Sequence, residues 1–160
     1  MNLLWQTALG MYFVATDRFD EGESTLRHVL ELEPSFWLAY PWLALIRLRR
    51  GLPAEALPLL EKAHALVPSN WYDIGLLAGT LERLGETRRA ASFIEKLDDG
   101  AAFGAPARFV CYHYVRGDLD HAAEWFEKVI AQRDTRAPWI LPHTLGSFLM
   151  SSPHWPRLAK

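Results

Sequence analysis

Cysteine is almost missing from this sequence, since Cys111 is the single one among 160 residues. One thiol can form no disulfide within the chain and cannot build a four-thiolate zinc site. The cysteine content therefore gives no sign of an oxidising compartment, and we expect a cytoplasmic protein.

The sequence also lacks an excess of charge and a long apolar run. Seventeen Lys and Arg face nineteen Asp and Glu, for a net charge of -2, which offers no general attraction to nucleic acid or to an anionic membrane. The longest strongly apolar stretch, residues 36–46, contains a proline and falls well short of the roughly 20 residues that span a bilayer. No basic flank precedes the first apolar residues, so a signal peptide is not indicated. We expect neither nucleic acid nor a membrane as a partner.

Catalytic signatures are missing too: there is no phosphate-binding glycine loop and no HExxH motif. Cys111 and His113 are two residues apart, hence about 200° apart around a helix, which disfavours a shared metal or a thiolate–imidazole pair. His121 and Glu124 share a helix face, but this spacing is typical of a solvated surface. The sequence predicts no catalytic residue, no cofactor and no metal site, and thus a protein that is not an enzyme.

What the sequence does contain is an internal repeat. Gly51, Gly85 and Gly117 are separated by 34 and then 32 residues. Similar steps recur in other series: Pro34 and Pro68; Ala56, Ala90 and Ala122; Leu26, Leu60, Ile94 and Phe126; and the pairs Leu9-Gly10, Leu43-Ala44, Leu77-Ala78 and Phe109-Val110. Apolar residues follow a helical spacing on both sides of each glycine, so each unit is predicted to be a helical hairpin.

The second unit shows the expected hairpin most clearly. Its first helix is predicted from about Phe36 to Arg50, Gly51 supplies the positive φ that ends it, and Pro53 fits the first turn of a second helix that runs to about Leu66. Two further prolines, at positions 41 and 58, are expected inside these helices, where each removes a backbone hydrogen bond.

Small residues recur where the two helices of a hairpin should approach closely. They are Gly10, Ala44 and Ala78 on the first helices and Ala56, Ala90 and Ala122 on the second helices. A bulky side chain there would force the helix axes apart, while the large series from Leu26 to Phe126 fills the space between hairpins.

The leucine-small pair, the later Ala, the large apolar residue and the closing Pro resemble the pattern of tetratricopeptide repeats. The repeats cover about residues 3–36, 37–70, 71–102 and 103–134. The resemblance implies an all-α fold, a right-handed α-solenoid of four helix-turn-helix hairpins. Gly22 departs from the pattern, because the family prefers Ala there.

The tail, residues 135–160, does not continue the period. The segments FEKVIAQRDTRAPWIL and SSPHWPRLAK resemble the end of bacterial tetratricopeptide arrays attached to serine/threonine kinases, adenylate cyclases and winged-helix regulators. The resemblance implies an arginine-aspartate turn, an apolar irregular stretch and a short last helix that starts near Ser152 and Pro153 and faces inward with Trp155 and Leu158. Such a tail would cover the open face of the last hairpin.

At the other end, the first helix begins almost at Met1, with Leu3, Leu4 and Trp5 already in phase and no polar capping element ahead of them. This start indicates either a part of a longer protein or an edge that associates with a second chain, and a naturally short chain with a frayed first helix is the alternative.

Function is predicted from the side of the hairpins that the first helices line, which is the concave side in this family. The predicted peptide-binding groove consists of Leu4, Thr7, Met11 and Val14, then Leu38, Leu45, Leu48 and Arg49, then Tyr72, Gly75, Gly79, Glu82 and Arg83, and finally Cys111, Tyr114 and Val115. This surface is apolar and lacks the Lys, Arg and Asn ring of a carboxylate clamp, so it suits an amphipathic helix or an extended hydrophobic segment.

Two functions stay open at this point. The first is a protein–protein interaction scaffold with a hydrophobic partner, within a bacterial signalling protein, whose groove the chain's own tail could also fill. The second is self-assembly through the first hairpin. For the arginines that end the helices, pairing with the helix dipole is the simpler interpretation, and projection of Arg49 and Arg83 into the groove is the alternative.

Overall fold

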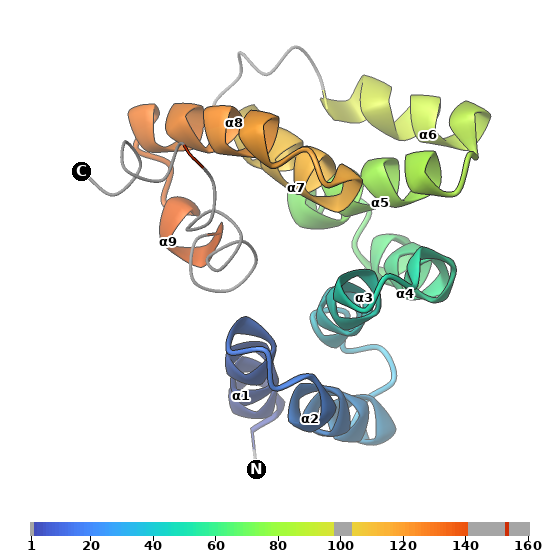
Figure 1. Ribbon diagram of the computed structural model, residues 1–160. Coiled ribbons are helices and arrows are strands. Elements are labelled where there is room, and N and C mark those ends of the chain that lie inside the picture. Colours follow the sequence, from blue (N-terminus) through green and yellow to red (C-terminus); the bar gives the residue numbers. More distant parts are fainter. Residues whose placement is uncertain (1, 98–103, 141–152, 154–160) are drawn as a thin grey trace. The chain divides into compact units, whose positions relative to one another are not determined.

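The structure is a computed structural model that describes residues 2–97, 104–140 and 153. Over these residues every regular element is a helix, and the chain divides into two compact units, Met1–Asn70 and Trp71–Lys160 (Figure 1). The predicted all-α fold class is confirmed. None of the described helices is long and apolar enough to cross a membrane.

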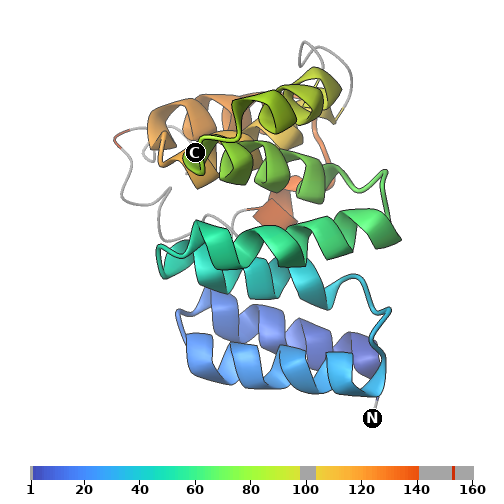
Figure 2. The ribbon, with the colours of Figure 1, turned by 90° about the vertical axis from the view of Figure 1, so that its right-hand side faces the viewer.

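The first unit consists of two helical hairpins. Helices α1 (Leu3–Ala15) and α2 (Phe19–Leu32) form the first hairpin, and α3 (Ala39–Arg49) and α4 (Pro53–Leu66) form the second. Helix α3 contacts both α1 and α2, so the hairpins stack side by side (Figure 2).

The second unit repeats this arrangement with a shorter second helix. Its elements are α5 (Trp71–Arg83), α6 (Thr87–Ile94), the 3-10 turn η1 (Glu95–Leu97), α7 (Ala105–Arg116), α8 (Leu119–Ala131) and the single turn α9 (Ala137–Ile140). Helix α5 packs against α6 and α7, and α7 packs against α8. The core between them includes Ile74, Ala78 and Leu97.

The turn of each hairpin has a residue in the left-handed region. Gly51, Gly85 and Gly117 have φ values of 74°, 75° and 78°, which confirms the predicted glycine caps. Asp17 has a φ of 61° in the first hairpin, 34 residues before Gly51. In all four turns the next amide donates to the carbonyl oxygen five residues earlier, which closes the helix end. The turn geometry thus continues into the first repeat, where an aspartate tolerates it.

Close helix contacts explain the small residues. A Cβ atom on Gly10 would lie 2.7 Å from the Cγ atom of Leu26, so α1 and α2 could not approach as they do with any larger residue. On Gly22, where the family prefers Ala, a Cβ atom would lie 3.0 Å from a methyl of Val14. The other predicted small positions are fully buried: Ala44, Ala56, Ala78, Ala90 and Ala122. Among the large residues, Ile94 is only partly buried, while Leu26, Leu60 and Phe126 are fully buried.

The expectation for Pro41 is wrong. Helix α3 begins at Ala39 rather than near Phe36, so Pro41 lies in its first turn. Backbone N–H groups in the first turn have no acceptor within the helix, so the N–H that proline lacks at this position would have made no helical hydrogen bond. Pro58 does lie inside α4, as expected.

The last long helix ends in the predicted arginine-aspartate turn. Arg133 has a φ of 52°, and the amide of Asp134 donates to the carbonyl of Val129 at 3.1 Å. The buried Asp134 carboxylate accepts hydrogen bonds from the backbone N–H of Arg136 at 3.0 Å and from its Nε at 2.9 Å. Helix α9 follows.

The remainder of the tail, with Ser152, Trp155 and Leu158, lies outside the described residues. Its role as a cover of the last hairpin stays a prediction.

Candidate functional site

The predicted groove positions of the first unit are mostly buried. Thr7, Met11, Val14, Leu45 and Leu48 are at most 7% exposed. Leu4 is 55% exposed, and Leu38 and Arg49 are partly exposed. A partner can therefore reach Leu4 and Leu38 directly, whereas the buried positions hold the helices in place.

The second unit shows the same division. Tyr72, Gly75, Gly79, Cys111, Tyr114 and Val115 are buried, Glu82 is partly exposed and Arg83 is exposed. A Cβ atom on Gly75 would lie 2.3 Å from the carbonyl oxygen of Arg108, and one on Gly79 would lie 2.8 Å from that of Tyr112. These glycines therefore let the backbones of α5 and α7 touch, a role that sequence reasoning did not assign to them. Whether the predicted groove binds a partner stays a prediction.

Cys111 lies in the interior of the second unit. Its side chain is fully buried, and burial raises the pKa of the thiol, with the negative charge of Asp73 adding to the effect. The thiol is therefore a packing group and not a nucleophile at neutral pH.

The arginines at the end of α3 connect the two hairpins of the first unit. Arg47 and Arg50 both donate to the carboxylate of Glu23 on α2. Arg49 forms an ion pair with Asp17 and lies over the ring of Phe19, so its charge is used within the unit. In the second unit, Arg83 donates to the carbonyl of Val115 at 3.3 Å.

Glu23 is the centre of this charge network. Its carboxylate accepts hydrogen bonds from Nε of Arg27 at 2.8 Å, from Nη1 of Arg47 at 2.8 Å and from Nη1 of Arg50 at 2.9 Å. The side chain is only 17% exposed. The hydrogen bond from Arg47, together with the other two arginines, lowers the pKa of Glu23 from 4.5 to about 2. The network could not be found by helix spacing, because Glu23 is 24 and 27 residues away from two of its partners.

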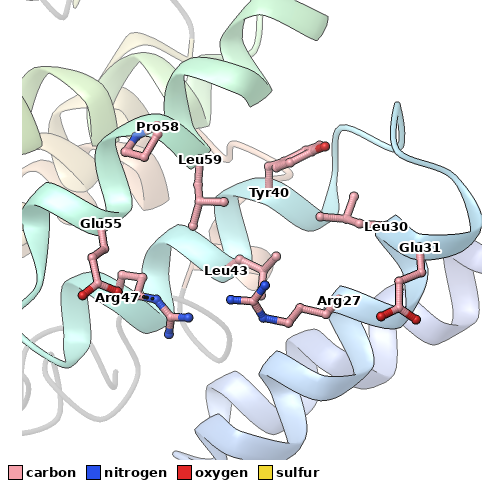
Figure 3. Close-up of a pocket in the computed structure, with 9 residues that line it drawn as sticks. All are labelled: Arg27, Leu30, Glu31, Tyr40, Leu43, Arg47, Glu55, Pro58 and Leu59. Carbon is pink, nitrogen blue, oxygen red and sulfur yellow. Dashed lines mark ion pairs between the residues drawn. The ribbon is translucent and has the colours of Figure 1, made fainter.

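A pocket of about 490 Å³ lies beside this network, among α2, α3 and α4 (Figure 3). Leu30, Leu43 and Leu59 contribute its apolar wall. The charged residues on its rim have ionic partners: Nε of Arg47 lies 3.1 Å from Glu55, Arg27 donates to Glu23 outside the lining, and Glu31 lies 3.4 Å from His28. The pocket therefore offers mainly apolar contact.

A polar cluster lies at the turn between α7 and α8. His113 is in the last turn of α7, Asp118 caps the N-terminus of α8, and His121 lies three residues further along. Nδ1 of His121 is 2.8 and 2.9 Å from the two Asp118 oxygens, and Nδ1 of His113 is 3.3 Å from one of them. Sequence reasoning paired each histidine with another residue and missed this group. The spacing His-x4-Asp-x2-His across a glycine turn was the signal.

The pKa values in this cluster shift in different directions. Burial lowers the pKa of His113, against the opposing effect of Asp118. The hydrogen bond to Asp118 raises the pKa of the exposed His121. Partial burial opposes ionisation of Asp118, yet the hydrogen bonds from His121 leave its pKa lowered.

Helix α1 has an exposed apolar face. Trp5, Leu9 and Tyr12, at helical positions i, i+4 and i+7, are 73%, 45% and 53% exposed, and Leu4 beside them is 55% exposed. Oδ1 of Asn2 accepts a hydrogen bond from the amide of Leu4 at 2.9 Å, so Asn2 is the N-cap of this helix.

Comparison with known proteins supports the fold. No family model matches the sequence, and no curated protein sequence matches it. The solved structure described as the functional characterization of Pseudomonas aeruginosa pilF is similar, with a TM-score of 0.60 over 91% of this chain and 68% of that chain. The two sequences are 20% identical, so the likeness concerns the fold alone. It supports a tetratricopeptide-like helical repeat.

Proposed function

We propose that this chain is a non-catalytic protein–protein interaction scaffold that binds a hydrophobic peptide or helix along the first helices of its hairpins. The repeated hairpin carries the proposal. Four turns share one backbone conformation, and tetratricopeptide-like repeats present the same helix surface several times over. Repeated presentation suits the binding of an extended or helical partner.

The hydrophobic character of the partner is inferred from the accessible positions. Leu4 and Leu38 are the predicted groove leucines with exposed surface in the first unit, and Arg49, the predicted groove cation of this unit, is already paired with Asp17. An acidic peptide would have to compete with that ion pair, whereas an apolar side chain would not.

We further propose that the chain functions in the cytoplasm as part of a larger bacterial signalling or regulatory protein. The support is the likeness of residues 126–141 and 151–160 to the ends of such arrays.

Selection of displayed peptides on the full-length chain tests the binding proposal. We expect helical peptides with an apolar face to be enriched. A Leu4→Ser, Leu38→Ser double variant should weaken their binding at least about 30-fold, because two interface anchors contribute more than about 1 kcal/mol each. The control is Lys62→Glu, an exposed change on α4, which should leave the Kd unchanged.

Equal weakening by Lys62→Glu and by the double variant would contradict the proposed surface. Enrichment of acidic C-terminal peptides alone would contradict the hydrophobic partner.

Self-assembly is a second candidate, and the exposed face of α1 favours it. Four large apolar side chains, Leu4, Trp5, Leu9 and Tyr12, are exposed on one helix. Large exposed apolar patches are typical of interaction surfaces. In this alternative the face of α1 packs against α1 of a second copy.

Sedimentation over a range of concentrations distinguishes the two functions. Self-assembly predicts a dimer that a Trp5→Ser, Tyr12→Ser variant converts to monomer, while the control Leu32→Ser, at an equally exposed leucine of α2, leaves the dimer intact. A wild-type chain that stays monomeric at all concentrations would rule out this candidate.

A further inference from the structure

The turn between α7 and α8 brings together three side chains that can each donate a ligand atom to a metal ion. His113, Asp118 and His121 offer two imidazole nitrogens and a carboxylate oxygen, and these atoms all lie within 4.8 Å of one another. No other group of three His, Cys, Asp or Glu side chains among the described residues meets that distance. We propose that His113, Asp118 and His121 form a surface binding site for a divalent transition metal such as Zn²⁺.

The distances suit tetrahedral coordination. With metal–nitrogen and metal–oxygen bonds of about 2.0–2.2 Å, neighbouring ligand atoms are about 3.3–3.5 Å apart. The separation between Nδ1 of His113 and Oδ2 of Asp118 is already 3.3 Å, and those from Nδ1 of His121 to the carboxylate are 2.8 and 2.9 Å. The two imidazole rings lie 5.3 Å apart with an angle of 23° between their planes. All three ligand atoms lie within 4.8 Å of one another, and reorientation of the exposed His121 side chain would bring them to the spacing around a bound ion.

The fold positions two of the ligands before any metal binds. The His113 ring stacks on Phe109 and lies edge-on to Tyr112, and the side chain is only 14% exposed. Gly117, with its φ of 78°, turns the chain so that Asp118 follows as the cap of α8. Metal binding would therefore cost little ordering of the chain, since mainly His121 has to be fixed.

Charged side chains around the proposed site affect how well it would hold a cation. Asp120 and Glu124 both act on His121 as negative charges, whereas Arg116 acts on His113 as a positive one. Nε of Arg116 is engaged by Glu82 at 2.9 Å, and the guanidinium lies over Tyr112. The positive charge is thus partly neutralised.

The donor set selects the class of metal. Imidazole nitrogen suits Zn²⁺, Co²⁺, Ni²⁺ and Cu²⁺, whereas Mg²⁺ and Ca²⁺ prefer oxygen ligands alone. Three protein ligands leave a fourth position for water or for a side chain of a bound partner. His121 and Asp118 are 58% and 32% exposed, so the fourth position faces the surface.

Calorimetric titration of the untagged full-length chain with Zn²⁺ tests the proposal, and Co²⁺ absorption spectra report the ligand geometry. We expect one saturable site and a visible Co²⁺ band of tetrahedral type. Removing a residue that only hydrogen-bonds to a metal ligand already weakens metal binding about tenfold. His121→Ala removes a ligand itself, so it should weaken Zn²⁺ binding by more than about tenfold. Asp118→Asn should do the same while keeping the helix cap, because Asn is also a good cap.

The matched control is His28→Ala. His28 is exposed on α2 and lies 3.4 Å from Glu31, and within the described part of the chain no third ligand joins this histidine–carboxylate pair. Its removal should leave Zn²⁺ affinity unchanged, and circular dichroism in the presence of a chelator checks that every variant is folded. The absence of saturable Zn²⁺ binding would overturn the proposal, as would equal weakening by His28→Ala and His121→Ala.

Discussion

Replacing Glu23 by glutamine removes the negative charge on which three arginines converge. The amide keeps the size of the side chain and one oxygen acceptor, so the change is mainly electrostatic. Arg27, Arg47 and Arg50 would then face one another with only partial compensation, and the contact between α2 and α3 would weaken.

The size of the effect follows from the pKa of Glu23. A fall from 4.5 to about 2 corresponds to about 3 kcal/mol of stability near neutral pH, at about 1.4 kcal/mol per pH unit. Because the pKa is lower in the folded state, this contribution is fully present above pH 4.5 and is lost as the pH falls toward 2. Solvent reaches part of the network, so we expect about 2–3 kcal/mol from Glu23→Gln.

Urea denaturation of the wild type and of Glu23→Gln, near neutral pH and at about pH 3, measures this contribution. The difference between the two proteins should be large near neutral pH and should shrink by more than half at about pH 3. Glu21→Gln is the matched control, because Glu21 lies on the same helix and pairs with Arg18 on the exposed surface. A pH-independent difference, or an equal loss from Glu21→Gln, would refute the reasoning.

Three further predictions concern packing. Gly75→Ala should lower the free energy of unfolding by about 3 kcal/mol in urea denaturation, because its Cβ atom would lie 2.3 Å from a carbonyl oxygen. The control is Gly51→Ala, whose Cβ atom would have no neighbour within 4 Å. It should cost only about 1–2 kcal/mol, because alanine disfavours the positive φ of that position. Ala90→Arg should cost more than about 3 kcal/mol, and a variant with the wild-type Tm would show that the fully buried Ala90 does not lie at a tight contact. Cys111 should react with a thiol reagent only after unfolding, and rapid labelling of the native chain would contradict its burial.

The parts of the fold that depend on local chemistry could be predicted from the sequence. Gly51 adopts the positive φ that its place in the repeat indicated, and Gly10 makes the close contact that its small size indicated. Errors arose where neighbouring turns decide the outcome. The residues before Ala39 form separate turns, so α3 starts late and Pro41 falls in its first turn.

Interactions between residues far apart in the chain could not be predicted from the sequence. Glu23 meets Arg47 and Arg50 only because α2 and α3 pack together, and spacing within one helix says nothing about that contact. The cluster of His113 with Asp118 and His121 depends on how tightly Gly117 turns the chain. The burial of Tyr72 and Tyr114 was not predicted either. Their spacing along the first helices indicated groove positions open to a partner, but the two side chains are 9% and 7% exposed.

The central claim, that the first helices of the hairpins bind a hydrophobic partner, is tested most directly by hydrogen–deuterium exchange of the full-length chain with and without a selected apolar peptide. We expect the peptide to slow amide exchange in α1, α3, α5 and α7, while α2 and α4 exchange as before. Protection confined to α2 and α4, or to no helix at all, would contradict it.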